Sequence, residues 1–300
     1  MSRSNRTLVL VVVLISLVAG GLLLLHWETP RVELAPEHLF TIAGFAVTNT
    51  ILTAYLTTAL LALLFWLITR RLKVVPGRAQ AAAELAVETL LGLCTNAAGE
   101  QNGRRFFTLV TTIFLFVLVA NWMGLLPGFG TIGVLQTEPA AQTAVIPAAA
   151  EAGSSHAVLV PIFRGATTDL NTTLALALVA VSATEIFGVR ALGAGQYLSK
   201  FFNFKGGPMA TFVGLIELIS ELSRIISLSF RLFGNIFAGE VLLAVVAFLV
   251  PLVATLPFLG LELFVGFVQA LIFAMLTLVF MTIATIGHGE HQEESAEHGH

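Results

Sequence analysis

The sequence predicts an all-α protein that crosses the membrane several times, with about five to six membrane helices, of which the last two are long and strongly tilted. Only 11% of the 300 residues are charged and 57% are hydrophobic, and the mean hydropathy is +0.92. Soluble domains carry about 25% charged residues, so this chain has too little charge to cover a soluble globule. Long apolar runs recur along the chain, separated by short polar segments. The net charge of −3 gives no reason to expect a nucleic-acid partner.

The first apolar run covers residues 8–25 and follows two arginines, Arg3 and Arg6. Eighteen residues are long for the core of a signal peptide, and the pair Gly20 and Gly21 makes a poor cleavage site. We therefore favour a retained helix, with a cleaved signal sequence as the alternative. Residues 1–40 are assigned to this segment and an external loop.

The second apolar run, about residues 42–68, ends in the basic sequence TRRLK. Basic clusters of this kind mark the cytoplasmic side of a membrane protein. An alanine-rich segment follows, with Glu84 and Glu88 one helical turn apart. It predicts an amphipathic helix on or near the cytoplasmic surface.

The third run, about residues 106–126, stops at Pro127, since proline and the glycines around it end a helix. Residues 128–169 are rich in Ala, Pro, Gly and Thr with few basic residues, which is typical of an external loop. A fourth run at about 170–189 is followed by Arg190 and further basic residues that return the chain to the cytoplasm.

The C-terminal part is apolar over more than forty residues, 208–250, without a turn signal. As a helix it would be about 60 Å long, twice the hydrocarbon thickness. It must therefore form a hairpin or lie strongly tilted. Pro251 and Pro257 are expected to bracket a short turn before the last run, 258–286, which is also longer than an upright crossing needs. Residues 287–300 form a polar tail rich in His and Glu.

Ionisable residues lie inside this apolar region, in the stretch SLSFRLFGNIFAGE. A charge at the centre of a membrane helix costs about 2.5–3.5 kcal/mol on insertion scales, and such residues mark ion pathways by default. On a helix, four residues share one face: Arg224, Ser227, Arg231 and Asn235. Glu240 lies nine residues after Arg231 and faces the opposite way. The alternative is that Arg231 snorkels or pairs with a nearby glutamate.

The last run contains its own polar pair, Glu262 and Gln269, seven residues apart and about 10 Å apart along one helix face. For Glu240 and Glu262 the alternative to a transport role is hydrogen-bonded packing. For Asn235 and Gln269 it is hydrogen bonding between helices.

Motifs of soluble catalysis are absent from the sequence: we find no Walker motif, GxGxxG fingerprint, CxxC pair or nucleophile elbow. The single cysteine, Cys94, excludes an intramolecular disulfide, and nothing near it suggests a metal site. We predict no cofactor and no metal. The function is expected to lie within the membrane.

SLSFRLFGNIFAGE, together with the downstream GFVQALIFAMLTLVF, resembles subunit a of the F-type ATP synthase, the membrane-sector stator subunit of the proton channel. Three further stretches are similar to the same family: PEHLFTIAGF, NWMGLLPGFG and TTDLNTTLALAL. The resemblance runs from about residue 36 to 286. We assign the family's membrane domain to residues 41–290.

This resemblance implies roles for the polar residues. The family's essential arginine matches Arg231, its channel-lining acidic position matches Glu240, and its asparagine and glutamine match Asn235 and Gln269. Members vary at the position of Glu262. The fold implied has two long tilted helices against a ring of c subunits.

The function implied is that of a non-catalytic, proton-translocating stator subunit that offers two half-channels to the c-ring, with Arg231 between them. Arginine keeps its proton in proteins, so it stabilises the ionised ring carboxylate and blocks direct proton passage. Glu240 and Glu262 would relay protons on the external side, and Asn235 and Gln269 would line the cytoplasmic path. The partners implied are the c-ring, b-type stalk subunits, the F1 sector indirectly and the lipid membrane. The location implied is the plasma (inner) membrane of a bacterium.

Two alternatives remain open. A stand-alone secondary transporter with Arg231 as an anion site would predict an internal repeat with broken helices in two halves, and the sequence has none that we can see. A Na⁺-translocating version of the same subunit depends on the ring's binding site, which this chain does not contain. The roles of four further polar residues stay unassigned: Asn121, Asp169, Glu185 and Glu217.

Overall fold

The computed structural model describes residues 36–42, 44–70, 72–126, 129, 132–139, 155–201, 207–250 and 255–286. The first apolar run and the polar tail lie outside these residues. In chain order the elements are β1 (His38–Ile42), β2 (Phe45–Thr48), α2 (Asn49–Thr69), α3 (Arg78–Ala98), α4 (Glu100–Gly124), β4 (Gly133–Pro139), β5 (Ser155–Pro161), the 3-10 turn η2 (Ala166–Thr168), α6 (Leu170–Leu192), α7 (Ala194–Ser199), α8 (Gly207–Leu249) and α9 (Thr255–Thr285).

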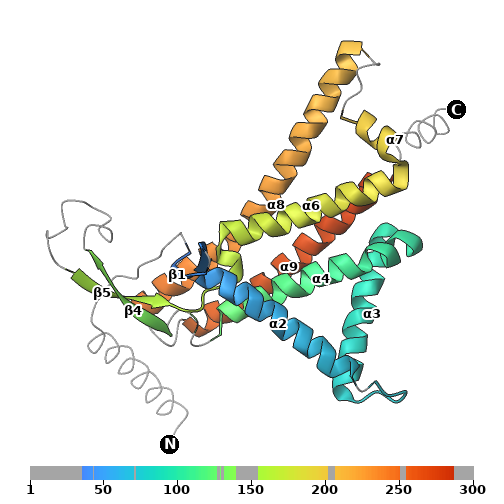
Figure 1. The fold of residues 1–300 in the computed structure, drawn as a ribbon. Helices are drawn as coiled ribbons and strands as arrows, with labels where there is room; N and C mark the ends of the chain where they lie inside the picture. Colours follow the sequence, from blue (N-terminus) through green and yellow to red (C-terminus); the bar gives the residue numbers. More distant parts are fainter. Residues whose placement is uncertain are drawn as a thin grey trace, which may run out of the picture.

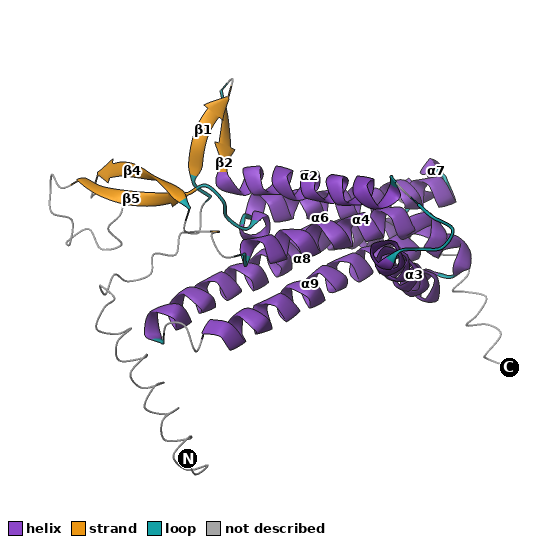
Figure 2. Cartoon of the chain, turned by 90° about the horizontal axis from the view of Figure 1, so that it is seen from below, coloured by secondary structure: helices purple, strands orange, loops and turns teal. Residues whose placement is uncertain are grey.

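Five of these helices, α2, α4, α6, α8 and α9, are long and apolar enough to cross a membrane. They form one bundle from which the beginning of α8 diverges in Figure 1, with both strand pairs at one end of the bundle and α7 at the other (Figure 1, Figure 2). We call the end where α2 begins at Asn49 the outer end, and the end where α6 meets α7 the inner end. The predicted class, an all-α protein with several membrane helices, is confirmed.

The outer end of the bundle contains β-structure that the sequence analysis did not predict. The strands β1 and β2 form an antiparallel hairpin that turns at Gly44, whose φ of 85° favours glycine. The side chain of Thr48 then accepts a hydrogen bond from the backbone N–H of Ile51 and begins α2. The expectation of a helical run from residue 42 is therefore wrong at its start, because the strand residues are also apolar and only the short polar stretch 48–50 separates them from the rest of the helix.

The segment expected to be an external loop, 128–169, also contains an antiparallel strand pair, β4 and β5. It ends in η2 and in Asp169, whose Oδ1 accepts from the N–H of Asn171 at the start of α6. Asp169 Oδ2 accepts a second hydrogen bond from Thr50 Oγ1, 3.0 Å away. Asp169 is thus a buried helix cap that ties α6 to α2.

The segment 208–250 forms one continuous helix: α8 has 43 residues, and at 1.5 Å per residue it is about 65 Å long. α9 has 31 residues. The prediction that the last two helices are long is confirmed. Pro257 was expected to mark the end of a short connecting turn. It lies instead inside helix α9, near its start. Proline is tolerated there because the first N–H groups of a helix have no partner within the helix.

The predicted amphipathic helix after Pro76 is confirmed as α3, which packs on the first half of α4. A Cβ on Gly103 of α4 would overlap the backbone of Thr95 and Cys94. The absence of a side chain at Gly103 therefore allows the two helices to approach closely. Cys94 is buried by this contact.

Small residues let the membrane helices pack closely. The buried positions of α6 are Thr173, Ala177, Ala180, Val181, Thr184 and Gly188. α9 likewise buries Gly266, Ala270, Ala274, Thr277 and Ala284 among larger residues. Lipid tails are as apolar as leucine side chains, so packing of this kind, rather than removal of apolar surface from water, holds membrane helices together.

Candidate functional site

Glu240 of α8 and Glu262 of α9 line one cavity of about 100 Å³ toward the outer end of the bundle. Its other lining residues come from the end of α4, from the segment before α6 and from α8: Asn121, Gly124, Leu125, Gly165, Thr168, Ile236 and Leu243. The sequence analysis expected Glu240 to point away from the arginine face. The structure brings the two carboxylates to the same cavity.

Gly239 places Glu262 directly against the backbone of α8. A Cβ at Gly239 would overlap both carboxylate oxygens and the carboxylate carbon of Glu262. Glu262 is buried, and its Oε1 has no hydrogen-bond partner among the described residues. A buried polar atom without a partner costs about 1–3 kcal/mol, and functional sites are one place where proteins retain such atoms.

Arg164 provides a positive charge at this site that the sequence analysis did not identify. Its Nη2 lies 3.3 Å from Glu240 Oε2, and its side chain is 7% exposed against 40% for Glu240. It comes from the extended segment between β5 and η2. The only sequence signal for Arg164 was that it is a basic residue in a segment, 128–169, with few other basic residues.

Hydrogen bonds fix the frame around the cavity. Asn121 accepts from Thr167 Oγ1 at 2.8 Å and donates to the carbonyl of Gly266 at 3.1 Å. The indole N–H of Trp122 donates to the carbonyl of Leu263 at 3.0 Å. These bonds join the end of α4 to η2 and to α9. The sequence analysis left the role of Asn121 unassigned. In the structure its side chain holds the wall of the cavity together.

Gln269 and Asn235 do not line this outer cavity. Gln269 is buried on the same inward face of α9 as Glu262, as their spacing predicts, and its Nε2 has no hydrogen-bond partner among the described residues. Asn235 is half-buried on α8. Gln269 therefore belongs to the packed interior of the bundle, whereas Asn235 lies at its surface edge.

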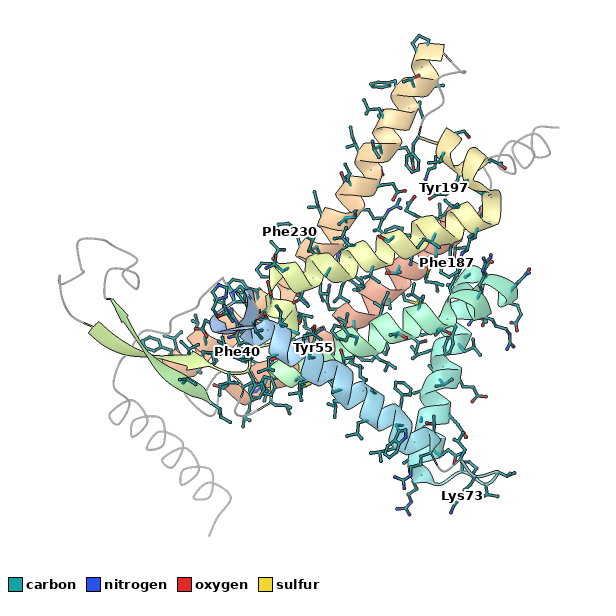
Figure 3. All side chains as sticks on the ribbon, in the orientation of Figure 1. Phe40, Tyr55, Lys73, Phe187, Tyr197 and Phe230 are labelled. Carbon is teal, nitrogen blue, oxygen red and sulfur yellow. The ribbon has the colours of Figure 1, made fainter. Side chains whose placement is uncertain are left out.

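Arg231 is exposed on α8. Within the described part of the chain, it makes no ion pair or hydrogen bond through its side chain. Its neighbour Phe230 is 54% exposed and lies on the side of α8 that faces away from the bundle (Figure 3), whereas Leu232 is fully buried. Arg224 was predicted to share the helix face of Arg231, but its side chain contacts other residues of this chain. It donates to Glu221 at 2.6 Å and lies 4.3 Å from the ring centroid of Phe280 on α9.

A second polar cluster lies at the inner end. Lys200 Nζ is 2.6 Å from Glu217 Oε1 and 3.5 Å from Glu221 Oε1. These residues and Arg224 line a cavity of about 860 Å³ between the α6–α7 connection, α8 and α9. The sequence analysis left the role of Glu217 open and did not single out Lys200 or Glu221 as partners.

Tyr197 of α7 lies beside this cluster, in the space between the α6–α7 connection and α8 (Figure 3). Burial and then the neighbouring Glu185 raise the pKa of Tyr197, so its hydroxyl stays protonated. The two groups are close but do not meet the geometry of a hydrogen bond. A Cβ on Gly188 of α6 would overlap the Tyr197 ring, so this glycine makes room for it.

The two polar cavities lie on either side of Arg231 along α8. Arg231 is seven residues after Arg224, which lines the inner cavity, and nine residues before Glu240, which lines the outer one. These separations correspond to about 10 Å and 13 Å of helix. An exposed cation therefore lies between two cavities that each contain carboxylates.

The chain is similar in sequence to known proteins over most of its length. Residues 51–282 match the sequence family described as ATP synthase A chain. The chain is 35% identical to ATP synthase subunit a 3 of Pelobacter propionicus over 260 residues, which cover 86% of this chain and 94% of the relative. It is 34% identical to ATP synthase subunit a of Gloeobacter violaceus, over 81% of this chain and 86% of that protein. It is also 34% identical to ATP synthase subunit a of Campylobacter jejuni subsp. doylei, over 74% and 84% respectively.

Proposed function

The chain belongs to the ATP synthase subunit a family, and we propose that it is the proton-translocating stator subunit, with two half-channels separated by Arg231. Family membership makes it a multi-pass membrane component of an F-type ATP synthase. The observation that carries the proposal is the position of Arg231, an exposed cation between two polar cavities.

In this proposal the exposed face of α8 around Arg231 meets the c-ring. A ring carboxylate can pass through lipid when it is protonated and neutral. Opposite Arg231 it is stabilised in the ionised form, because a guanidinium keeps its proton and favours a nearby negative charge. Protons cannot pass the arginine directly, so they must travel with the rotating ring. Each proton that crosses 100 mV releases about 2.3 kcal/mol, and several are needed for one ATP.

The outer cavity would supply protons from the external side. Its two carboxylates, Glu240 and Glu262, come from different helices and line the same small space. A pair of carboxyl groups can share one proton and remain partly neutral, which suits a relay within the membrane.

The inner cavity would form the entrance of the second half-channel. It is lined by Glu217 and Glu221 and lies next to Tyr197, and the basic clusters of the sequence place this end at the cytoplasm. Gln269 would continue the path between this cavity and Arg231. Asn235 follows Arg231 by four residues on α8, toward the outer cavity, so we propose that it lies beside the arginine and not on the path from the inner cavity.

The partners in this proposal are the c-ring, b-type stalk subunits and, indirectly, the F1 sector, in the plasma membrane of a bacterium. Residues 1–40 would precede the family domain at 41–290, and 287–300 would follow it as a tail. The translocated ion is proposed to be H⁺, with Na⁺ as the alternative. A stand-alone secondary transporter is less well supported, because family membership gives the chain a place in a larger complex.

The proposal is tested with the whole complex reconstituted in vesicles, where ATP hydrolysis drives ion uptake. Arg231→Ala should abolish acidification of the lumen, because nothing would favour deprotonation of the ring carboxylate at the interface. Arg190→Ala is the matched control, since Arg190 is an exposed arginine at the inner end of α6. Wild-type acidification should not require Na⁺. Normal pumping by Arg231→Ala would refute the role of this residue, and a strict Na⁺ requirement would favour the sodium alternative.

A further inference from the structure

We propose that Arg164 is a positioning residue of the outer relay, which holds the carboxylate of Glu240 at the wall of the cavity that it shares with Glu262. The inference rests on the proposed function, since it assigns a role within the external half-channel. It concerns a residue that lies outside the membrane helices and about 76 positions from its partner.

The burial of Arg164 argues that the contact with Glu240 matters. Its side chain is 7% exposed, and its Nη2 donates to Glu240 Oε2 at 3.3 Å. Arginine is almost never fully buried unless it is paired, because removing a charge from water is costly. Burying this guanidinium therefore requires an anion beside it, and Glu240, which lines the outer cavity, supplies one.

Close backbone packing holds the segment that carries Arg164. A Cβ on Gly124, at the end of α4, would lie 3.2 Å from the Cα of Gly165. Thr168 Oγ1 donates to the carbonyl of Gly165 at 2.7 Å. Together with the bond from Thr167 to Asn121, these contacts attach the turn to α4. The position of Arg164 is therefore set by the bundle and not by a free loop.

The consequence is a fixed geometry for Glu240. Glu240 is 40% exposed and lies on a long helix, so its unbranched side chain has several rotamers open to it. Arg164 contacts one carboxylate oxygen from one side of the cavity, and Gly239 brings Glu262 to the neighbouring position on α8. Proton transfer needs donor and acceptor within hydrogen-bond reach, directly or through one water. A Glu240 that is free to turn away would make the transfer slower.

The test compares proton flux per assembled complex in reconstituted vesicles. Arg164→Gln should slow ATP-driven pumping about tenfold, and Arg164→Lys should recover part of the rate because it retains a cation. Arg190→Gln, the same chemical change at an exposed site, should pump at the wild-type rate. A wild-type rate in Arg164→Gln would overturn the proposal.

The decisive comparison uses the Glu240→Gln background. If Arg164 acts through Glu240, the double variant Arg164→Gln/Glu240→Gln should pump no more slowly than Glu240→Gln alone. If Arg164 only supports the fold, the two losses should multiply, and the proposal fails. The double variant also removes both charges of this pair together, so it does not leave the Glu240 carboxylate without its cation, as Arg164→Gln alone does. The proposed function itself would fail in a different measurement, normal pumping by Arg231→Ala.

Discussion

Gly239→Ala is expected to disable the outer relay while leaving helix α8 intact. An ideal Cβ at position 239 would overlap the Glu262 carboxylate, and ordinary contacts between such atoms need about 3.5 Å. The carboxylate would have to move by about 1 Å or more, and a misplacement of that size can slow a reaction about 100-fold. The helix itself should gain about 0.8–1.0 kcal/mol, because alanine is the better helix former. A loss of transport would therefore not reflect a weaker helix.

The assay is ATP-driven acidification by reconstituted complexes, with Gly92→Ala as the matched control. Gly92 lies within helix α3, away from the face of α8 around Arg231, and a Cβ there would meet no atom within 4 Å. We expect a 10- to 100-fold loss for Gly239→Ala and a wild-type rate for Gly92→Ala. Combining Gly239→Ala with Glu262→Asp should restore part of the rate, because the shorter side chain withdraws from the new methyl group. Equal rates for the two alanine variants would refute the inference that the Glu262 position matters.

Three further predictions concern the relay, the lone cysteine and the topology. Glu240→Gln and Glu262→Gln should each slow proton transport, and the double change should cost much less than the product of the single losses; multiplicative losses would mean independent roles. Burial raises the pKa of the Cys94 thiol, and the thiolate is the reactive form, so maleimide labelling should be slow at pH 7.5 and increase only at higher pH than for an exposed cysteine. Labelling of Cys94 as fast as that of an exposed thiol would contradict its burial. A cysteine at Glu138 should react with an impermeant reagent from outside, and one at Ser199 only after permeabilisation; the reverse pattern would exchange the two half-channels.

Composition and hydropathy were sufficient to predict the fold class because a membrane chain must satisfy its backbone groups within helices. The strand pair β1–β2 was missed because its residues are about as apolar as those of α2, and only three polar residues, 48–50, separate the two. For residues 208–250 the sequence predicted either a hairpin or one long tilted helix. The structure shows one helix, α8, without a break.

Helix periodicity could predict that Glu240 faces away from Arg231, and the family resemblance implied that Glu240 and Glu262 act on the same side. Arg164 could not be predicted, because it lies in an extended segment without periodicity and its partner is distant in sequence. The same reason applies to Lys200, which follows the short helix α7 and pairs with Glu217 and Glu221 on α8. Contacts of this kind depend on how separate elements come together, which a local pattern does not encode.

The central claim is that a permanent, forked cation at position 231 separates the two half-channels, and Arg231→Lys tests it most directly. A lysine keeps the positive charge, but it is a compact ammonium that can lose its proton when buried and cannot form the forked contact of a guanidinium. The measurement is ATP-driven acidification in reconstituted vesicles, with the passive proton leak recorded on the same vesicles. The account predicts that Arg231→Lys does not pump and that Arg231→Ala fails to pump while conducting protons passively. Pumping near the wild-type rate by Arg231→Lys would contradict it.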